Sequence, residues 1–333
     1  MPYDYLPPIK NKWTPVLMNS AWNSVTISRT LFYGTLAVLM VLLMNGCTGY
    51  FFYPMKELIH SPSDANIRYD DVTVTTRDNV DIHGWLLHAD HPKGIVFFLH
   101  GNAENISTHI ASVYWLPEQG YEVLLMDYRG YGQSQGSPAI PDVFLDVEAM
   151  YGWLEQYASE QQLPVYILGQ SLGASISSFY FSQLPPEQRI YEAVVLDAVF
   201  AGHRDITRDV LNRNIITWPL QFIVPLFMPT DYNPKDHVAN FNPIPLLFMH
   251  SPEDQVVPYE QGQTVYQRAA QPKFWVTSHG PHIATFGHPR YRRILLNFLE
   301  NPQQDPQRDL APLNGPSPTD LSQTDSSSSH NQK

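Results

Sequence analysis

The chain has very little cysteine, few basic residues and no metal-ligand pattern. Its single cysteine, Cys47, excludes an intrachain disulfide and a cysteine-rich zinc site. Lysine and arginine number 20 against 32 acidic residues, and no basic stripe is present. This balance argues against nucleic acid as a partner, because phosphate binding requires clustered cations. Histidine, cysteine and carboxylate residues do not cluster at ligand spacing, so we expect no metal and no organic cofactor.

Charged residues are also scarce relative to apolar ones. They make up 16% of the chain and hydrophobic residues 43%, which is typical of a folded protein, and 333 residues suffice for one large domain. Residues 302–333 differ, because they consist mainly of Pro, Gln, Asp and Ser. Such a segment buries too little apolar surface to offset the entropy of ordering, so we expect a disordered tail there.

The N-terminal region has the pattern of a targeting segment. Residues 31–44, LFYGTLAVLMVLLM, carry no charge and follow Arg29, as in a secretory signal. Cys47 comes directly after Gly46, which resembles the lipobox of bacterial lipoproteins, where this cysteine is lipidated and becomes the mature N-terminus. If the apolar run extends to Phe52, it instead reaches the roughly 20 residues of a signal anchor. A third interpretation is that Cys47 is a buried apolar residue.

We therefore expect residues 1–46 to be a targeting segment and residues 47–65 a linker. The predicted location is membrane-anchored and exported, as a lipoprotein facing the periplasm or cell exterior, with a single N-terminal signal anchor as the alternative. The stretch before Arg29 is long for the start of a signal, so translation could begin at Met18 instead of Met1.

Between residues 66 and 301, short β-prone runs alternate with amphipathic stretches. Two early runs, YDDVTVTT and VDIHGWLLHA, flank a turn at Asp78 and Asn79 and predict a hairpin. The later runs are almost continuously apolar, as in strands buried on both faces of a parallel sheet; they span residues 94–100, 121–128, 164–169, 192–200, 243–251 and 272–278. This alternation predicts an α/β fold with a doubly wound, mostly parallel, eight-stranded sheet.

One connection in this domain is much longer than the others. Residues 201–242 contain apolar runs broken by Pro219, Pro225 and Pro229. A segment of this size with its own apolar surface is usually a lid or cap, and we predict a short cap insertion here. The alternative is that the segment packs as additional core.

The sequence GQSLG places Ser171 where a predicted strand passes into a predicted helix. Ligands of a parallel sheet bind beyond the carboxyl ends of its strands. A sharp turn at this point would raise the Ser171 hydroxyl above the sheet, and the glycines at positions 169 and 173 would let neighbouring backbones approach. We predict that Ser171 is a nucleophile, with a helix-capping serine as the alternative.

A nucleophilic serine needs a histidine base that is oriented by a carboxylate. Asp254 and His282 follow the next suitable strands in the chain order Ser, acid, His, which is typical of this fold. The alternatives for the base are His279 and His288, and those for the acid are Glu253 and Asp197. The oxyanion formed during attack needs backbone N–H donors; we expect them at Leu172 and at Asn102 or Ala103, with His100 bracing the loop.

The motifs HGNAEN, DYRGYGQSQG, GQSLG, EDQVVP and GPH, in this order, are similar to those of the α/β hydrolase superfamily. More narrowly, they resemble its lysophospholipase-like, serine aminopeptidase-like and depalmitoylase-like branch, over about residues 66–300. The resemblance implies the α/β hydrolase fold and these site residues: Ser171 as nucleophile, Asp254 as acid, His282 as base, the amides of Asn102 and Leu172 as oxyanion donors, and a structural Arg129. The chain has HSPED where HGxxD is usual, and Pro281 where glycine commonly precedes the histidine.

These features predict a serine hydrolase that cleaves carboxylic esters or thioesters through an acyl-enzyme. An apolar cap favours an acyl chain, and a membrane-anchored enzyme would encounter lipid-like ester substrates. One alternative is a serine peptidase that acts on short peptides, because the same triad serves both reactions. The other is a noncatalytic lipoprotein that retains a hydrolase fold.

Overall fold

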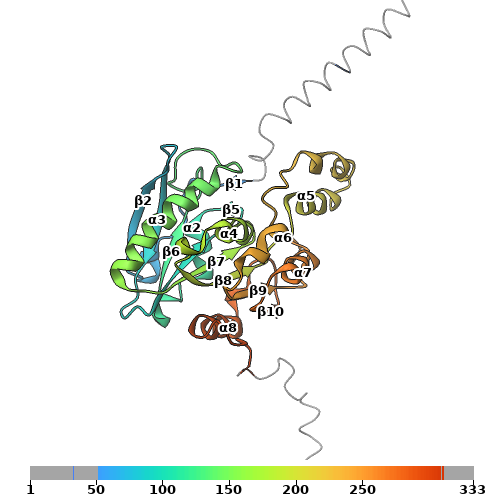
Figure 1. Ribbon diagram of the computed structural model, residues 1–333. Coiled ribbons are helices and arrows are strands. Elements are labelled where there is room, and N and C mark those ends of the chain that lie inside the picture. The colour runs from blue at the N-terminus through green and yellow to red at the C-terminus, as the bar shows by residue number, and fades with distance from the viewer. Residues whose placement is uncertain (1–32, 34–51, 309, 311–333) are drawn as a thin grey trace, which may run out of the picture. The chain divides into compact units, whose positions relative to one another are not determined.

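The computed structural model describes residues 33, 52–308 and 310 (Figure 1). Of the two units into which the chain divides, Met1–Tyr50 and Phe51–Lys333, the second contains the folded domain. The predicted targeting segment apart from Tyr33, the lipidation candidate Cys47, both possible start residues and most of the predicted tail lie outside the described residues. Among the residues that are described, no helix has both the length and the apolarity needed to cross a membrane.

Within the described domain, the central sheet has eight strands in the order β10-β9-β8-β7-β4-β6-β3-β2. In the run β10-β9-β8-β7-β4-β6 every neighbouring pair is parallel, whereas β3 is antiparallel to both β2 and β6. The predicted doubly wound, mostly parallel sheet is therefore confirmed. The bounds are β2 Tyr69–Thr75, β3 Asp81–Leu87, β4 Gly94–Leu99, β6 Tyr121–Met126, β7 Val165–Gln170, β8 Tyr191–Asp197, β9 Leu246–His250 and β10 Lys273–Thr277.

Two strands differ in detail from the prediction. The strand expected at 192–200 ends at Asp197, because Ala198 has a positive φ of 55° that an extended strand does not accommodate. The strand expected to be buried on both faces at 272–278 is β10, whose residues Lys273–Trp275 are only partly buried. Its place at the edge of the sheet explains this exposure.

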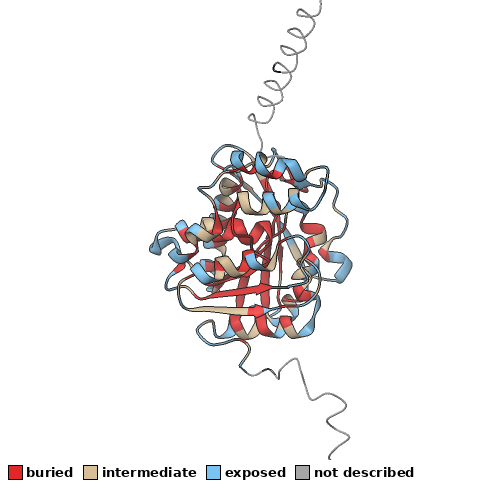
Figure 2. Cartoon of the chain, turned by 90° about the vertical axis from the view of Figure 1, so that its right-hand side faces the viewer, coloured by how far each residue is buried: buried red, intermediate tan, exposed pale blue. Residues whose placement is uncertain are grey.

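Helices cover both faces of the sheet (Figures 1 and 2). Alternate side chains along a strand enter different cores. On β4, Phe97 faces the core formed with α3, α4 and α7, whereas Phe98 faces the core formed with η3 and α8. These helices span the following residues: α3 Val143–Gln161, α4 Leu172–Gln183, α7 Tyr259–Arg268, η3 Ile110–Ser112 and α8 Pro289–Glu300. Figure 2 shows buried strands between more exposed helical layers.

The segment 201–242 separates into two parts with different packing. Its first part contains α5, η6 and η7, which pack on one another and extend from the upper end of the domain in Figure 1. Its second part contains α6 and η8, which pack against α4, and there Val238 and Phe241 are buried in the core. The bounds are α5 His203–Asn212, η6 Trp218–Phe222, η7 Val224–Phe227, α6 Pro234–His237 and η8 Val238–Phe241.

The remaining short elements lie near the ends of the domain and in its loops. They are β1 Tyr53–Pro54, β5 Ala103–Glu104, η2 Pro62–Ala65, α2 Ile106–His109, η4 Pro117–Gln119, η5 Pro186–Gln188 and η9 Thr285–Gly287. Strands β1 and β5 form a separate parallel pair. The Asn297 side chain on α8 donates to Pro306 O, and the Gln307 side chain donates to Trp275 O, so the residues directly after 301 pack on the domain.

Candidate active site

The register of the sheet brings the ends of five strands to one edge. Leu99 of β4 pairs with Gly169 of β7, and Gln170 pairs with Asp197 of β8. Met249 of β9 pairs with Asp197, and the ends of β9 and β10 also pair. The loops that carry the predicted site residues therefore leave the sheet side by side.

Ser171 occupies a sharp turn between β7 and α4. Its φ of 54° and ψ of −112° are unusual for a residue with a side chain. A Cβ on Gly173 would lie 2.0 Å from Leu99 O, and one on Gly169 would lie 2.6 Å from Gly173 O. Both positions therefore require glycine because of close backbone approach, as we predicted from GQSLG.

The structure brings the side chains of Ser171, His282 and Asp254 together. The Nε2 atom of His282 lies 2.9 Å from Ser171 Oγ, and its Nδ1 lies 2.7 Å from Asp254 Oδ2. The Asp254 carboxylate can only accept, so Nδ1 carries the hydrogen and Nε2 is free to accept from the serine hydroxyl. This tautomer is the one that a base requires.

Asp254 is held firmly within its loop. Its Oδ1 accepts hydrogen bonds from the backbone amides of Val256 at 2.7 Å and Val257 at 2.9 Å, and its side chain is almost fully buried. Burial by itself raises the pKa of Asp254, but the neighbouring imidazoles of His250 and His282, with the Val257 amide, outweigh it and hold that pKa well below its ordinary value. Asp254 is therefore ionised when it orients His282.

The two alternative bases, His279 and His288, form hydrogen bonds with other residues. His279 is exposed and its Nδ1 lies 3.2 Å from Glu253 Oε1, so the alternative base pairs with an alternative acid. His288 caps α8 by accepting from the Arg290 amide. Neither is the histidine that contacts Ser171.

Asp197, the other alternative acid, is fully buried next to the serine turn. It accepts from the Gln170 side chain at 2.8 Å and from the Thr285 hydroxyl at 2.8 Å, and its backbone carbonyl accepts from the Ser171 amide. Burial raises the pKa of Asp197. Its hydrogen bonds therefore hold the strand ends together, whereas the carboxylate that accepts from His282 Nδ1 is that of Asp254.

The predicted oxyanion donors lie in two adjoining segments. Leu172 is the first residue of α4, where helix geometry leaves the amide N–H without an intrahelical acceptor. Asn102 lies between β4 and β5, and its carbonyl accepts from the Tyr131 hydroxyl at 2.5 Å. The carbonyl of Ala103 accepts from His109 Nε2 at 2.9 Å. The loop is thus fixed by its carbonyl oxygens.

The sequence did not reveal what holds this loop from the outside. Residues 52–59, which we call the strap, lie within the predicted linker and run along the loop through the β1–β5 pair. The Met55 amide donates to Glu104 O at 3.1 Å, and buried Phe52 packs against the Tyr131 ring. A two-residue strand has no periodicity from which it could have been predicted.

Asn105 is the main link between the strap and the loop. Its Nδ2 donates to Met55 O at 3.0 Å and to Glu57 O at 2.7 Å, and its Oδ1 accepts from the amide and hydroxyl of Ser107. The side chain is fully buried and also caps α2. The Ser107 hydroxyl in turn accepts from the Ile59 amide at 2.8 Å.

Two buried histidines lie beneath the same loop. His100 donates from Nδ1 to Gly101 O at 2.7 Å and packs against the rings of Tyr128 and Tyr131. Burial, together with the nearby His100 and His282, lowers the pKa of His109 to about 3. Both therefore contribute packing and hydrogen bonds in the described structure, in agreement with a bracing role for His100.

The predicted structural residue Arg129 connects three segments. Its backbone amide and Nε donate to Asp146 on α3, each at 2.8 Å, and its terminal nitrogens contact Asp78 in the β2–β3 turn. Arg129 directly follows Tyr128 in the loop after β6. It thereby holds the hairpin and α3 against this loop.

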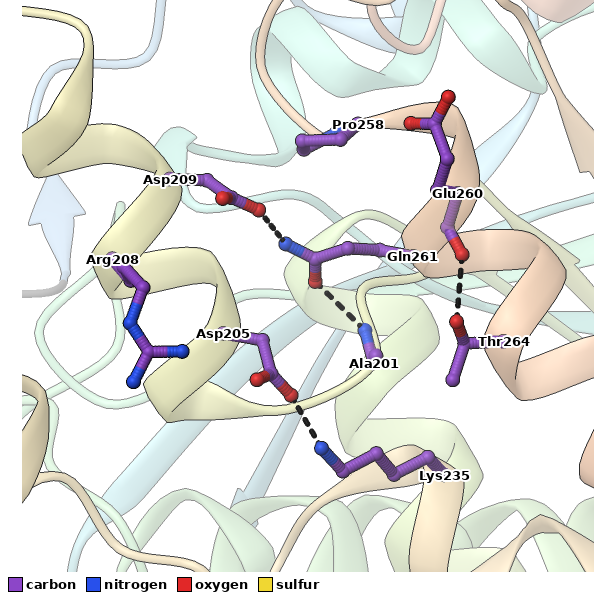
Figure 3. A pocket seen from close by; sticks show the side chains of 9 residues that line it. All are labelled: Ala201, Asp205, Arg208, Asp209, Lys235, Pro258, Glu260, Gln261 and Thr264. Atoms are coloured by element: carbon purple, nitrogen blue, oxygen red, sulfur yellow. Dashed lines mark hydrogen bonds and ion pairs between the residues drawn. The ribbon is translucent and has the colours of Figure 1, made fainter.

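A separate polar pocket of about 380 Å³ lies between α5 and α7 (Figure 3). Gln261 accepts from the Ala201 amide at 2.9 Å and donates to Asp209, and Lys235 pairs with Asp205 (Figure 3). None of the predicted catalytic residues lines this pocket. Its hydrogen bonds join α7 to the base of the cap. In the described chain, no group of three His, Cys, Asp or Glu residues is arranged to hold a metal ion.

Comparison with solved structures decides the fold. The chain aligns with the Pyrococcus furiosus esterase Pf2001 with a TM-score of 0.61 at 22% identity, covering 75% of this chain and 97% of the esterase. It also aligns with the Pyrococcus horikoshii acylaminoacyl peptidase with a TM-score of 0.52 at 16% identity, covering 70% of this chain and 41% of the peptidase. This is the α/β hydrolase fold.

Sequence relatives of this chain are consistent with the α/β hydrolase fold. Residues 90–238 match the family described as serine aminopeptidase, S33. The uncharacterized protein YfhR of Escherichia coli K12 is 26% identical over 259 residues, which are 75% of this chain and 86% of that protein. The lysophosphatidylserine lipase ABHD12 of Danio rerio is 29% identical over 232 residues, which are 64% of this chain and 59% of the lipase. Together these similarities indicate a hydrolase.

Proposed function

We propose that the chain is a serine hydrolase that cleaves carboxylic esters or thioesters of lipid-like acyl substrates. The observation that carries the proposal is the continuous hydrogen-bonded arrangement from Ser171 Oγ to His282 and on to Asp254, with contacts of 2.9 and 2.7 Å. A hydroxyl, an imidazole and a buried carboxylate in this order form a nucleophile and its base.

The reaction follows from the atoms that these residues present. Ser171 Oγ attacks the acyl carbonyl carbon while its proton passes to His282 Nε2, and Asp254 stabilises the imidazolium that forms. The amides of Leu172 and Asn102 would stabilise the oxyanion. His282 then protonates the leaving alcohol or thiol, and an acyl-enzyme remains. Water attacks this ester with His282 again as base, which releases the acid and restores Ser171.

A lipid-like substrate is supported by the chain and its relatives. The cap contains four Ile residues, three Phe residues and one Trp residue, and such apolar side chains favour an acyl chain. The relative from Danio rerio is named a lysophosphatidylserine lipase. The peptidase alternative is supported by the name of the matching family, serine aminopeptidase. Ester and amide substrates must therefore be tested together.

Replacing Ser171 by alanine tests the nucleophile. We expect kcat to fall by a factor on the order of 10⁶, because the triad acts as a unit. The melting temperature should change little, since alanine has the same constraint as serine at φ 54°. A fluorophosphonate should label the wild-type chain but not S171A. Ester turnover retained by S171A would mean that another group is the nucleophile, and an unlabelled wild type would favour the noncatalytic alternative.

A substrate series distinguishes the two reactions. We expect turnover of p-nitrophenyl esters of increasing acyl length, and of lysophosphatidylserine, to exceed turnover of aminoacyl and dipeptidyl p-nitroanilides. The reverse order would identify a peptidase.

We further propose that the chain is membrane-attached through Cys47 or through the apolar run at 31–44, as the sequence predicts. Cys47→Ser should release the protein from the membrane fraction if the cysteine is lipidated. Unchanged membrane retention of C47S would favour the signal anchor, and recovery of the wild-type chain in the soluble fraction would refute both.

A further inference from the structure

The first part of the cap exposes an unusual number of large apolar side chains. Nine of them lie on α5, η6, η7 and the turns between them, and together they form what we call the cap patch: Val210, Ile215, Ile216, Trp218, Leu220, Phe222, Ile223, Leu226 and Phe227. Ile215 is 89% exposed and Ile216 is 81% exposed. A contiguous segment of this kind on a soluble surface commonly marks an interaction site.

The cap patch is held in place by the structure behind it. Arg204 on α5 donates to Leu226 O and Met228 O, both at 3.2 Å. The Thr217 hydroxyl donates to Leu211 O at 2.9 Å, and the rings of Trp218 and Phe222 meet edge to face. These contacts fix the backbone while the apolar side chains remain outside.

The charge around the cap patch differs from that of the whole chain. Residues 210–230 contain Arg213 and no acidic residue, although the chain has a formal net charge of −12. Arg208 on α5 is exposed, whereas Asp205 and Asp209 of the same helix pair with Lys235 and Gln261. Apolar side chains next to arginine are typical of a surface that binds an anionic lipid interface.

The position of the cap patch fits this partner. Strand β1 and helix α5 both lie at the upper end of the domain in Figure 1, where Figure 2 shows exposed helical turns. Only four residues lie between Cys47 and Phe52, so the five residue steps that join them can span at most about 18 Å when extended. Attachment at or before Cys47, which is part of the proposed function, would keep this end of the domain close to the bilayer.

We propose that the cap patch docks on a lipid bilayer, with its apolar side chains at the boundary between headgroups and acyl chains and with Arg208 and Arg213 near anionic headgroups. Docking does not require the catalytic residues. It would place the cap of a hydrolase with lipid-like substrates at the surface from which those substrates come.

Trp218 provides a direct test in the full-length chain. The protein is reconstituted in vesicles of phosphatidylcholine and phosphatidylserine, with either brominated or unbrominated acyl chains, and tryptophan fluorescence is measured. We expect brominated lipid to quench a component of wild-type fluorescence that is absent from Trp218→Phe. The matched control Trp153→Phe, which removes a tryptophan from α3, should retain that component.

Charge substitution extends the test to the rest of the patch. Ile216→Asp combined with Phe222→Asp should reduce the Trp218 component of quenching at least twofold, while a Ser171→Ala chain should be quenched like wild type. Failure of the proposed catalysis would therefore leave the docking result unchanged.

Two results would overturn the proposal. One is equal quenching of wild type and Trp218→Phe by brominated lipid. The other is shielding of Trp218 from both brominated lipid and aqueous acrylamide, which would mean that protein covers the patch. Concentration-dependent association in detergent, lost in the double aspartate variant, would then identify a second copy of the chain as the partner.

Discussion

Replacing Asn105 by aspartate tests whether the strap positions the loop that carries the proposed oxyanion donor. Aspartate retains an oxygen that can accept from Ser107, and it caps a helix as well as asparagine does. It removes the two donations to Met55 O and Glu57 O and places a carboxylate against both carbonyl oxygens. The substitution therefore acts on the contacts with the strap and retains the N-terminal cap of helix α2.

The size of both effects follows from these contacts. Each lost hydrogen bond is worth about 1 kcal/mol, and an unpaired buried polar group costs a further 1–3 kcal/mol or so. We expect the free energy of unfolding to fall by about 3–5 kcal/mol. Complete removal of an oxyanion donor lowers kcat by about 10²–10³-fold. A displaced loop should cost less, so we expect kcat of N105D to fall by about 10–100-fold with little change in KM.

A matched control separates positioning from general destabilisation. Leu154→Ala in α3 removes a fully buried side chain far from the strap and should cost about 2–5 kcal/mol. Unfolding is measured in urea, and kcat and KM are measured with a p-nitrophenyl ester at a temperature where each variant is folded. L154A should keep the wild-type kcat. If N105D is destabilised but its kcat equals that of L154A, the strap does not position the oxyanion loop.

Three further substitutions test other parts of the site. Asp254→Asn should lower kcat by about 10³–10⁴-fold because His282 loses its acceptor. Asp197→Asn should keep kcat within about tenfold of wild type. A larger loss of kcat in D197N than in D254N would assign the acid to Asp197. Burial raises the pKa of Asp197, so ionisation of this carboxyl lowers the stability of the folded chain as pH rises through that pKa. In thermal melts from about pH 5 to about pH 9, the melting temperature of D197N should therefore fall less than that of wild type. Gly173→Ala places a Cβ 2.0 Å from Leu99 O, so we expect at least about 3 kcal/mol of destabilisation and no fluorophosphonate labelling; a folded, labelled G173A would contradict the close approach.

The strands and the order of the site residues could be predicted because buried parallel strands have a clear sequence pattern. Their carboxyl ends meet at one edge, so loops that are distant in sequence become neighbours. Choosing among the histidines required the loop conformation. Gly280, with a φ of 103°, lies between His279, which pairs with Glu253, and His282, which contacts Ser171. A difference of three residues in a loop has no periodic pattern that would indicate which side chain turns inward.

The strap could not be predicted because its partners are backbone atoms. Asn105 belongs to the motif HGNAEN, but the carbonyls that it binds belong to Met55 and Glu57, about 50 residues earlier in the chain. Every residue carries such a carbonyl, so nothing in the sequence marks these two as acceptors. The position of a loop in the candidate site can therefore depend on a segment whose sequence predicts only a linker.

The cap shows a second limit, which concerns the direction of apolar side chains. Phe241 and Phe222 lie in one connection, yet the first is buried and the second is 63% exposed. Pro219 and Pro225 fall within the 3-10 helices η6 and η7, which are too short to establish the 3.6-residue period of an amphipathic helix. Without that period, apolar composition predicts that the segment has apolar surface to bury, but not whether the core of the domain or another molecule buries it. In this chain the second part of the cap packs in the core, and the first part is the surface that we propose docks on the bilayer.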